Sequence, residues 1–259
     1  MPIPNRMPPN ALDYITIRGF KRIASIDKLP LKACNVLIGA NGSGKSNFVG
    51  VFEFLHAITE GELRDYVITA GGAEKVLHFG SKTTKGMFIR LSFSGEVDET
   101  EDFWELHLAP TNDDLLYSFA EVVHHQRKGE PDRIVKTFTP RLDQEHEAGI
   151  NNDQGALGGE VSWMRTFVSG WRIYHLNDTS SYSPMRKTAK VHDNRFLRPD
   201  GSNLAAFLYF LHEREEASYT LIRRTVQRVV PFFDDFRLEP LRLKPDDIKL
   251  EWRHKNSDQ

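Results

Sequence analysis

Alternating apolar and polar positions near the N-terminus predict a pair of β-strands. Residues 14–18 read Tyr-Ile-Thr-Ile-Arg, and a second strand is predicted over residues 23–29. A third segment, residues 34–38, is short and almost wholly apolar, which is typical of a strand buried on both faces of a sheet. This interpretation makes Cys34 a core residue.

A helical period follows residue 44. Apolar side chains recur at i, i+3, i+4 and i+7, so an amphipathic helix is predicted from Lys45 to about Thr59, with its apolar face formed by Phe48, Val51, Phe52 and Leu55. A second, shorter helix is predicted over residues 61–70, stopped by Gly71 and Gly72.

Four further strands, separated by turn-forming residues, predict an antiparallel meander inserted after the first helix. They cover residues 87–94, 103–108, 115–124 and 133–138. After the meander we predict a polar mobile loop (139–160), a helix (160–168), a strand (171–176) and a second polar loop (177–200). A long helix then begins at the cap residue Ser202 and ends at Pro231, and two strands follow at 236–241 and 248–253.

This order of elements predicts an α/β fold. We expect a disordered proline-rich extension over residues 1–10 and one domain over 11–259. Its parts are a first lobe with the meander (11–138), a loop-rich insertion (139–200) and a helix with closing strands (201–259).

Composition narrows the class of protein. The chain has 259 residues, 34 Lys and Arg against 36 Asp and Glu, and a single cysteine. A balance this close to neutral argues against a polybasic nucleic-acid binder, and one cysteine forms no intrachain disulfide. No apolar run approaches the roughly 20 residues of a membrane span. We therefore expect a cytoplasmic protein with no membrane partner.

One motif carries the candidate chemistry. The pattern G-x-x-x-x-G-K-[ST] is met between the predicted apolar strand and the amphipathic helix, by the residues Gly39, Ala40, Asn41, Gly42, Ser43, Gly44, Lys45 and Ser46. Glycines let the backbone curl so that its N–H groups form an anion-binding nest at the positive end of the helix. The motif predicts that ATP binds there, with Lys45 on the β- and γ-phosphates and the Ser46 hydroxyl on Mg²⁺.

Hydrolysis needs an additional acidic residue, and the sequence does not identify one. The nearest match to an apolar strand ending in acids is residues 229–235, but Pro231 is unsuited to a central strand, so a helix-ending turn is favoured there. Residues 156–160 (Ala-Leu-Gly-Gly-Glu) are interpreted as a flexible loop. The catalytic residue therefore stays unassigned.

The other clusters of polar residues give weaker signals. His124 and His125 are adjacent on a strand and point to opposite faces, so they cannot share a metal. The basic cluster Arg223, Arg224 and Arg228 is interpreted as a solvated helix face, with DNA contact as the alternative.

Several stretches resemble the start of RecF/SMC-type ATPase heads of the ABC class, and most closely a family of bacterial RecF-like ATPases. They are residues 17–22, 35–47, 70–73 (Ala-Gly-Gly-Ala), 77–80 (Leu-His-Phe-Gly), 193–208 and 231–236, and the likeness runs over most of residues 12–255. The resemblance implies a P-loop ATPase head in which two subunits enclose two ATP molecules. It extends the nucleotide site to Asn47 and, by family analogy, to Lys21 and Arg22.

In that family the ABC motif and the Walker B acids follow later than residue 259. We therefore expect an incomplete head that binds ATP and Mg²⁺. It is expected to hydrolyse ATP only when a missing C-terminal half, or a homodimeric or other partner chain, supplies those motifs. DNA is a further expected partner, and DNA repair or phage defence the context. The alternatives are a non-enzymatic ATP-sensing or interaction protein, a gene remnant and, with less support, a P-loop GTPase, a kinase or the nucleotide subunit of a transporter.

Overall fold

The computed structural model describes residues 11–94, 101–125, 133–137, 160–176, 178 and 180–255. The chain divides into two compact units, Met1–Trp171 and Arg172–Gln259, and each is described by itself. The predicted extension over 1–10 and almost all of the predicted loop over 139–160 lie outside the described residues.

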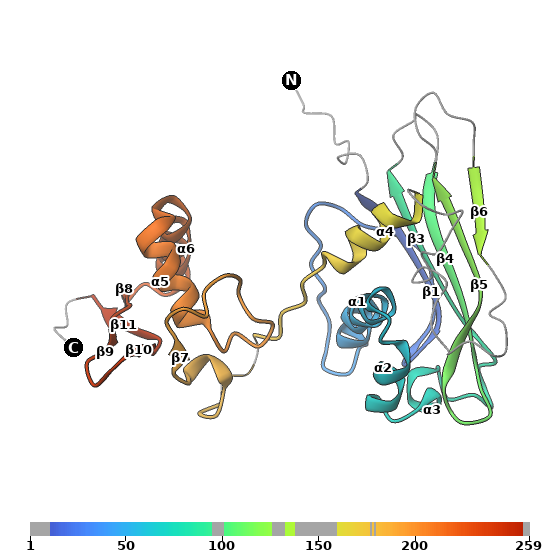
Figure 1. Ribbon diagram of the computed structural model, residues 1–259, viewed down its shortest axis with the longest axis horizontal. Helices are drawn as coiled ribbons and strands as arrows, with labels where there is room; N and C mark the ends of the chain where they lie inside the picture. The colour runs from blue at the N-terminus through green and yellow to red at the C-terminus, as the bar shows by residue number, and fades with distance from the viewer. Residues whose placement is uncertain are drawn as a thin grey trace, which may run out of the picture. The chain divides into compact units, whose positions relative to one another are not determined.

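The first unit is built on a six-stranded antiparallel sheet with the order β2-β1-β3-β4-β5-β6 (Figure 1). The predicted meander is confirmed, and each strand boundary lies within two residues of the one expected. The strands are β1 (Leu12–Phe20), β2 (Ile23–Pro30), β3 (Met87–Ser94), β4 (Glu101–Pro110), β5 (Leu116–His125) and β6 (Arg133–Thr137).

The helices of this unit lie on one face of the sheet (Figure 1). They are α1 (Lys45–Glu60), α2 (Leu63–Thr69), α3 (Ala73–Val76) and α4 (Glu160–Ser169). Phe54 of α1 is fully buried, with its ring 5.5 Å from that of Phe20 and 5.1 Å from that of Tyr66. The predicted helix is confirmed, but its face is confirmed only in part: Val51 and Leu55 are fully buried, whereas Phe48 and Phe52 are half-buried, and the buried face turns toward Phe54. This burial packs α1 against the sheet.

The prediction of a buried strand at residues 34–38 is wrong. These residues have no regular secondary structure, and the exposed fractions of Val36, Leu37 and Ile38 are 75%, 44% and 91%. Cys34 is exposed rather than a core residue. A short apolar run becomes a buried strand only where neighbouring strands pair with it, and none of the described strands does so.

The second unit holds two helices and short strands. The helices are α5 (Leu204–Arg214) and α6 (Glu216–Val229). One small sheet has the strand order β7 (Ala189–Lys190), β10 (Lys244–Ile248) and β9 (Pro240–Leu241). A second sheet pairs β8 (Phe233–Arg237) with β11 (Glu251–His254). A 3-10 turn covers Pro184–Arg186.

Three predictions for this unit are corrected. The single long helix is broken at Glu215, whose φ of -136° and ψ of 56° leave the helical region. Asn203, not Ser202, stands at the N-cap of α5. Residues 171–176 form no strand, because their backbone pairs with none of the described strands.

Candidate nucleotide-binding site

The loop over residues 39–44 leads directly into α1. Gly44 is the N-cap of the helix, with a φ of 96°, and Gly42 has a φ of 83°. Both values lie in the left-handed region that only glycine enters without strain, so the sequence of the motif accounts for the curl of the loop. The Ser43 N–H donates to the Ala40 carbonyl at 3.2 Å and closes the turn.

Lys45 is folded back over this loop. Its Nζ donates to the Gly39 carbonyl at 2.7 Å and to the Ala40 carbonyl at 2.8 Å, and it lies 3.4 Å from Ser43 Oγ. The ammonium group therefore lies over the loop that the motif predicts to hold phosphate. All three contacts are made with neutral oxygens, which an anionic phosphate oxygen can replace with a stronger charge-assisted bond.

The loop has the properties that a phosphate group requires. A Cβ atom added at Gly42 or at Gly44 would meet nothing within 4 Å, so the glycine backbone borders open space. No described side chain caps the helix, and the first N–H groups of a helix have no acceptor in a preceding turn. The Ser46 side chain is exposed in this first turn, where its hydroxyl is free to reach a metal ion beside the phosphates.

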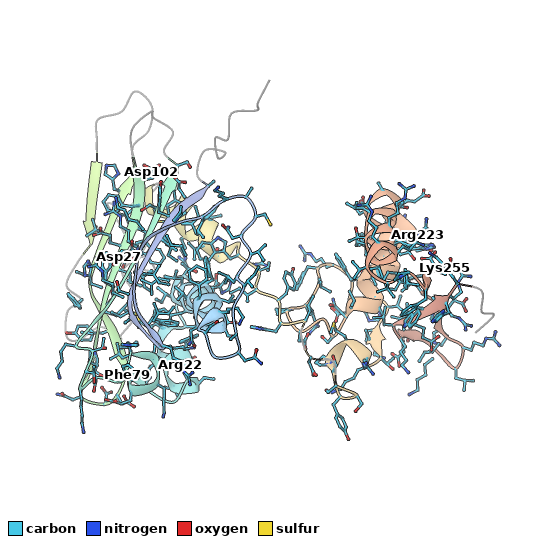
Figure 2. The ribbon with its side chains drawn as sticks, turned by 180° about the vertical axis from the view of Figure 1, so that it is seen from behind. Arg22, Asp27, Phe79, Asp102, Arg223 and Lys255 are labelled. Carbon is cyan, nitrogen blue, oxygen red and sulfur yellow. The ribbon has the colours of Figure 1, made fainter. Side chains whose placement is uncertain are left out.

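Lys21 lies further along α1 than the resemblance implies. Its Nζ donates to the Tyr66 hydroxyl at 3.1 Å and lies 5.5 Å from the centre of the Tyr66 ring. A Cβ atom at Gly50, in the second turn of α1, would be 3.7 Å from the same Nζ. The Lys21 ammonium group thus lies against the body of α1 and against α2, while the main chain of Lys21 bonds to Val76 and His78. Arg22 lies exposed in the β1–β2 turn (Figure 2).

The lysine–tyrosine contact was not foreseen from the sequence. Residue 66 falls on a predicted helix, and no spacing in the sequence links it to the turn at residue 21. Only the fold brings these positions together, and the contact connects the β1–β2 turn to the helices that follow the loop.

The acids at residues 234–235 lie in the second unit. The helix α6 ends at Val229, as the favoured interpretation of a helix-ending turn requires, and both acids are in β8. Asp235 accepts hydrogen bonds from the Tyr219 hydroxyl at 2.5 Å and from Arg223 at 3.2 Å. Its described contacts are thus those of a structural group.

The structure also locates the two histidines and the basic cluster that the sequence singled out. His124 is buried and stacks on Phe103 at 5.1 Å, while the side chain of His125 is not described. Arg224 and Arg228 are exposed, but Arg223 is half-buried against Asp235. The described residues contain no group of three His, Cys, Asp or Glu side chains that could hold a metal.

A glycine-rich loop of this kind at the start of a helix defines a class, the P-loop nucleotide-binding proteins of the α/β type. The chain belongs to the family described as "AAA domain, putative AbiEii toxin, Type IV TA system", whose model matches residues 34–239. That span includes the whole loop. No curated protein matches the chain. Within the described ranges, no helix has the length and apolar character that crossing a membrane requires.

Proposed function

We propose that this chain is the ATP-binding head of a RecF/SMC-like ATPase and that it binds Mg-ATP through residues 39–47. The observation that carries the proposal is the position of Lys45 over a curled glycine loop at the start of α1. Membership of the AAA family supports a nucleotide as the ligand, because the matched span contains this loop.

Each part of the loop has a distinct role in this proposal. The N–H groups of residues 42–46 surround the phosphate tail, and the partial positive charge at the helix start adds to their attraction. Lys45 exchanges its carbonyl partners for phosphate oxygens. Ser46 supplies one oxygen to Mg²⁺, which when bound neutralises phosphate charge.

We further propose that hydrolysis requires residues from a partner chain or a second copy. Among the described residues, the hydrogen bonds that hold Lys45 and the loop are accepted by main-chain carbonyls and by Ser43, and not by a carboxylate. An acid that holds Mg²⁺ and a group that positions water must therefore join the loop before turnover begins. The proposed context is DNA repair or phage defence.

An ATP-sensing protein without turnover is the second candidate. The same observation favours it, because a loop without an acid can bind a nucleotide and change stability without hydrolysing it. Steady-state turnover by the chain together with a second subunit separates the two candidates, since a sensor binds the nucleotide and releases it intact.

Calorimetric titration with Mg-ATP tests the proposal directly. The wild-type chain should show saturable binding, and Lys45→Ala should weaken it by about tenfold or more, because a charge-assisted contact to phosphate is lost. Lys32→Ala is the matched control, since Lys32 is an exposed lysine upstream of the loop. GTP as a competitor tests the choice of base.

The proposal is wrong if the folded chain shows no saturable uptake of Mg-ATP. Equal weakening by the Lys32 and Lys45 variants would also contradict it, because the attraction would then come from general surface charge rather than from the loop.

A further inference from the structure

Phe79 combines two unfavourable properties. Its side chain is 80% exposed, although it is a large apolar ring, and its φ of 54° lies in the left-handed region. An L-residue with a bulky side chain is rarely found there. Residues held in such a conformation cluster at ligand-binding sites, so Phe79 is a candidate contact residue.

The conformation is imposed by the surrounding backbone. The His78 N–H donates to the Gly19 carbonyl at 3.0 Å, and His78 Nδ1 donates to the Lys21 carbonyl at 2.9 Å. On the other side of Phe79, Gly80 is buried, and a Cβ atom there would collide with the Glu74 carboxylate. The ring is therefore held out from the surface by a fixed main chain rather than by a flexible loop.

The segment around Phe79 is rich in positive charge, and Glu74 is the acid that lies beside it. Residues 75–85 contain three lysines and no acid, and Lys82 and Lys85 are exposed. Arg22 follows Lys21 in the turn that is bonded to His78, and Figure 2 shows Arg22 and Phe79 at the same end of the unit. This concentration is local, because residues 1–171 hold 18 Lys and Arg against 23 Asp and Glu.

The Glu74 carboxylate, which lies beside Gly80, is engaged within the loop. Glu74 accepts bonds from the N–H and the hydroxyl of Ser81, and these bonds lower the pKa of its carboxyl group, with the Ser81 hydroxyl as the largest cause. Its contacts hold the turn in shape. The charges of Lys82 and Lys75 also contribute to this lowered pKa, so Arg22 and Lys85 are the cations of this end that stay available to an anionic partner, and Lys82 is shared with Glu74.

We propose that Phe79 and the cations Arg22, Lys82 and Lys85 form a binding surface for single-stranded nucleic acid. A base stacks on the exposed ring, and the flanking phosphates contact the three cations. The surroundings favour this partner over a protein, because an aromatic anchor in a protein interface is ringed by contacts that exclude water. The exposed residues that follow Phe79 in this loop are instead Lys82, Thr83, Lys85 and Gly86. The surface goes beyond the proposed function.

Fluorescence anisotropy with a labelled oligothymidylate of roughly 20 nucleotides tests the surface. The full chain should bind it with an affinity that falls as salt rises. Phe79→Ala should weaken binding by about fivefold or more, and Phe79→Trp should restore it, because stacking needs a ring. Lys82→Ala and Lys85→Ala should each weaken binding and lower the salt dependence.

Phe79→Gly separates binding from folding. Glycine accepts a φ of 54° without strain, so this variant should keep or raise the thermal stability while it loses affinity for the oligonucleotide. Tyr182→Ala is the matched control, since Tyr182 is 82% exposed in the second unit, and its affinity should equal that of the wild type.

Several results would overturn the proposal. They are no binding of the oligonucleotide at low salt, equal affinity of the alanine and tryptophan variants, and displacement of the oligonucleotide by excess Mg-ATP, which would place its phosphates in the glycine loop. Binding of poly-glutamate with the same dependence on Phe79 would assign the surface to an acidic peptide instead.

Discussion

The two units of this chain are stabilised in different ways. The first has a continuous apolar core that joins the sheet to α1, α2 and α4, and most of its large members are fully buried. The buried apolar cluster of the second unit is small, and its members are Ala189, Ala205, Ala206 and Ile248. Three of these four are alanines, whose burial contributes little apolar area.

Two groups of polar contacts link the elements of the second unit. Asn203 is fully buried, and its side chain makes three hydrogen bonds to the main chain between residues 193 and 198. Tyr219 is buried against Asp235, which also binds Arg223. One large apolar core therefore stabilises the first unit, whereas the second combines a few directional contacts with smaller apolar groups around Leu208 and Phe233. This contrast makes specific predictions about variants.

The largest expected effect is in the apolar core. Leu91 is fully buried on β3, so Leu91→Ala should lower the free energy of unfolding of the first unit by about 2–5 kcal/mol, from lost burial and the cavity left behind. Urea denaturation followed by circular dichroism measures this. A loss of less than about 1 kcal/mol would show that the sheet face is not packed as described.

Asn203→Ala should have the next largest effect. Its Oδ1 accepts the Arg198 N–H at 2.8 Å, and its Nδ2 donates to the carbonyls of Asp193 and Phe196 at 2.9 and 2.8 Å. Losing all three leaves buried main-chain groups unpaired, which should cost about 2–4 kcal/mol of the stability of the second unit. Hydrogen exchange within residues 172–255 measures it.

Asn194→Ala is the matched control for that variant. Asn194 is half-buried and donates one bond, to the Val191 carbonyl at 2.9 Å. Its loss should cost about 1 kcal/mol. Equal effects of the two asparagine variants would contradict the proposed role of Asn203 as the main polar link of this unit.

The sequence correctly predicted the elements that a local pattern of apolar, polar and turn residues marks. Short strand-like runs bounded by turn residues located the meander strands, and the 3.6-residue period located α1. Residues 34–38 form a run of apolar residues that has no period. Whether such a run is buried depends on strands from other parts of the chain that pair with it. The break at Glu215 was missed because apolar residues continue on both sides of it.

The sequence likewise predicted one part of the candidate site and missed another. The loop around Gly42 and Gly44 was predictable, since positive φ values require glycine and the motif specifies where they fall. The contact of Lys21 with Tyr66 was not, because it joins residues 45 positions apart through the packing of α2. Local geometry is therefore specified by the motif, while the surroundings of the site depend on tertiary packing.

Tyr219 should show a smaller effect, dependent on pH. Burial raises the pKa of its hydroxyl, and the bond to Asp235 raises it further. Above about pH 10 an unfolded tyrosine loses its proton while the folded one keeps it, so this contribution to stability is present below pH 10 and is lost as pH rises. Tyr219→Phe should cost about 1 kcal/mol at neutral pH.

The pH profile distinguishes that role from packing alone. The stability of the wild type should fall more steeply above pH 10 than that of Tyr219→Phe, whereas Tyr182→Phe, at an exposed position, should follow the wild type. Parallel profiles for the wild type and Tyr219→Phe would show that the hydroxyl is not buried against the carboxylate in solution.

The smallest expected effect tests the exposed segment before the glycine loop. Ile38 is 91% exposed, so Ile38→Ala should change the free energy of unfolding of the isolated chain by less than about 0.5 kcal/mol. Leu91→Ala is its matched comparison, because both positions are apolar and were predicted to lie in strands, yet only Leu91 is buried. If Ile38→Ala costs as much as Leu91→Ala under urea denaturation, residues 34–38 are packed in solution, and the correction to the predicted strand fails. If it costs nothing, an apolar segment next to Lys45 is open to solvent, which is the condition under which a partner that covers it can also reach the nucleotide site.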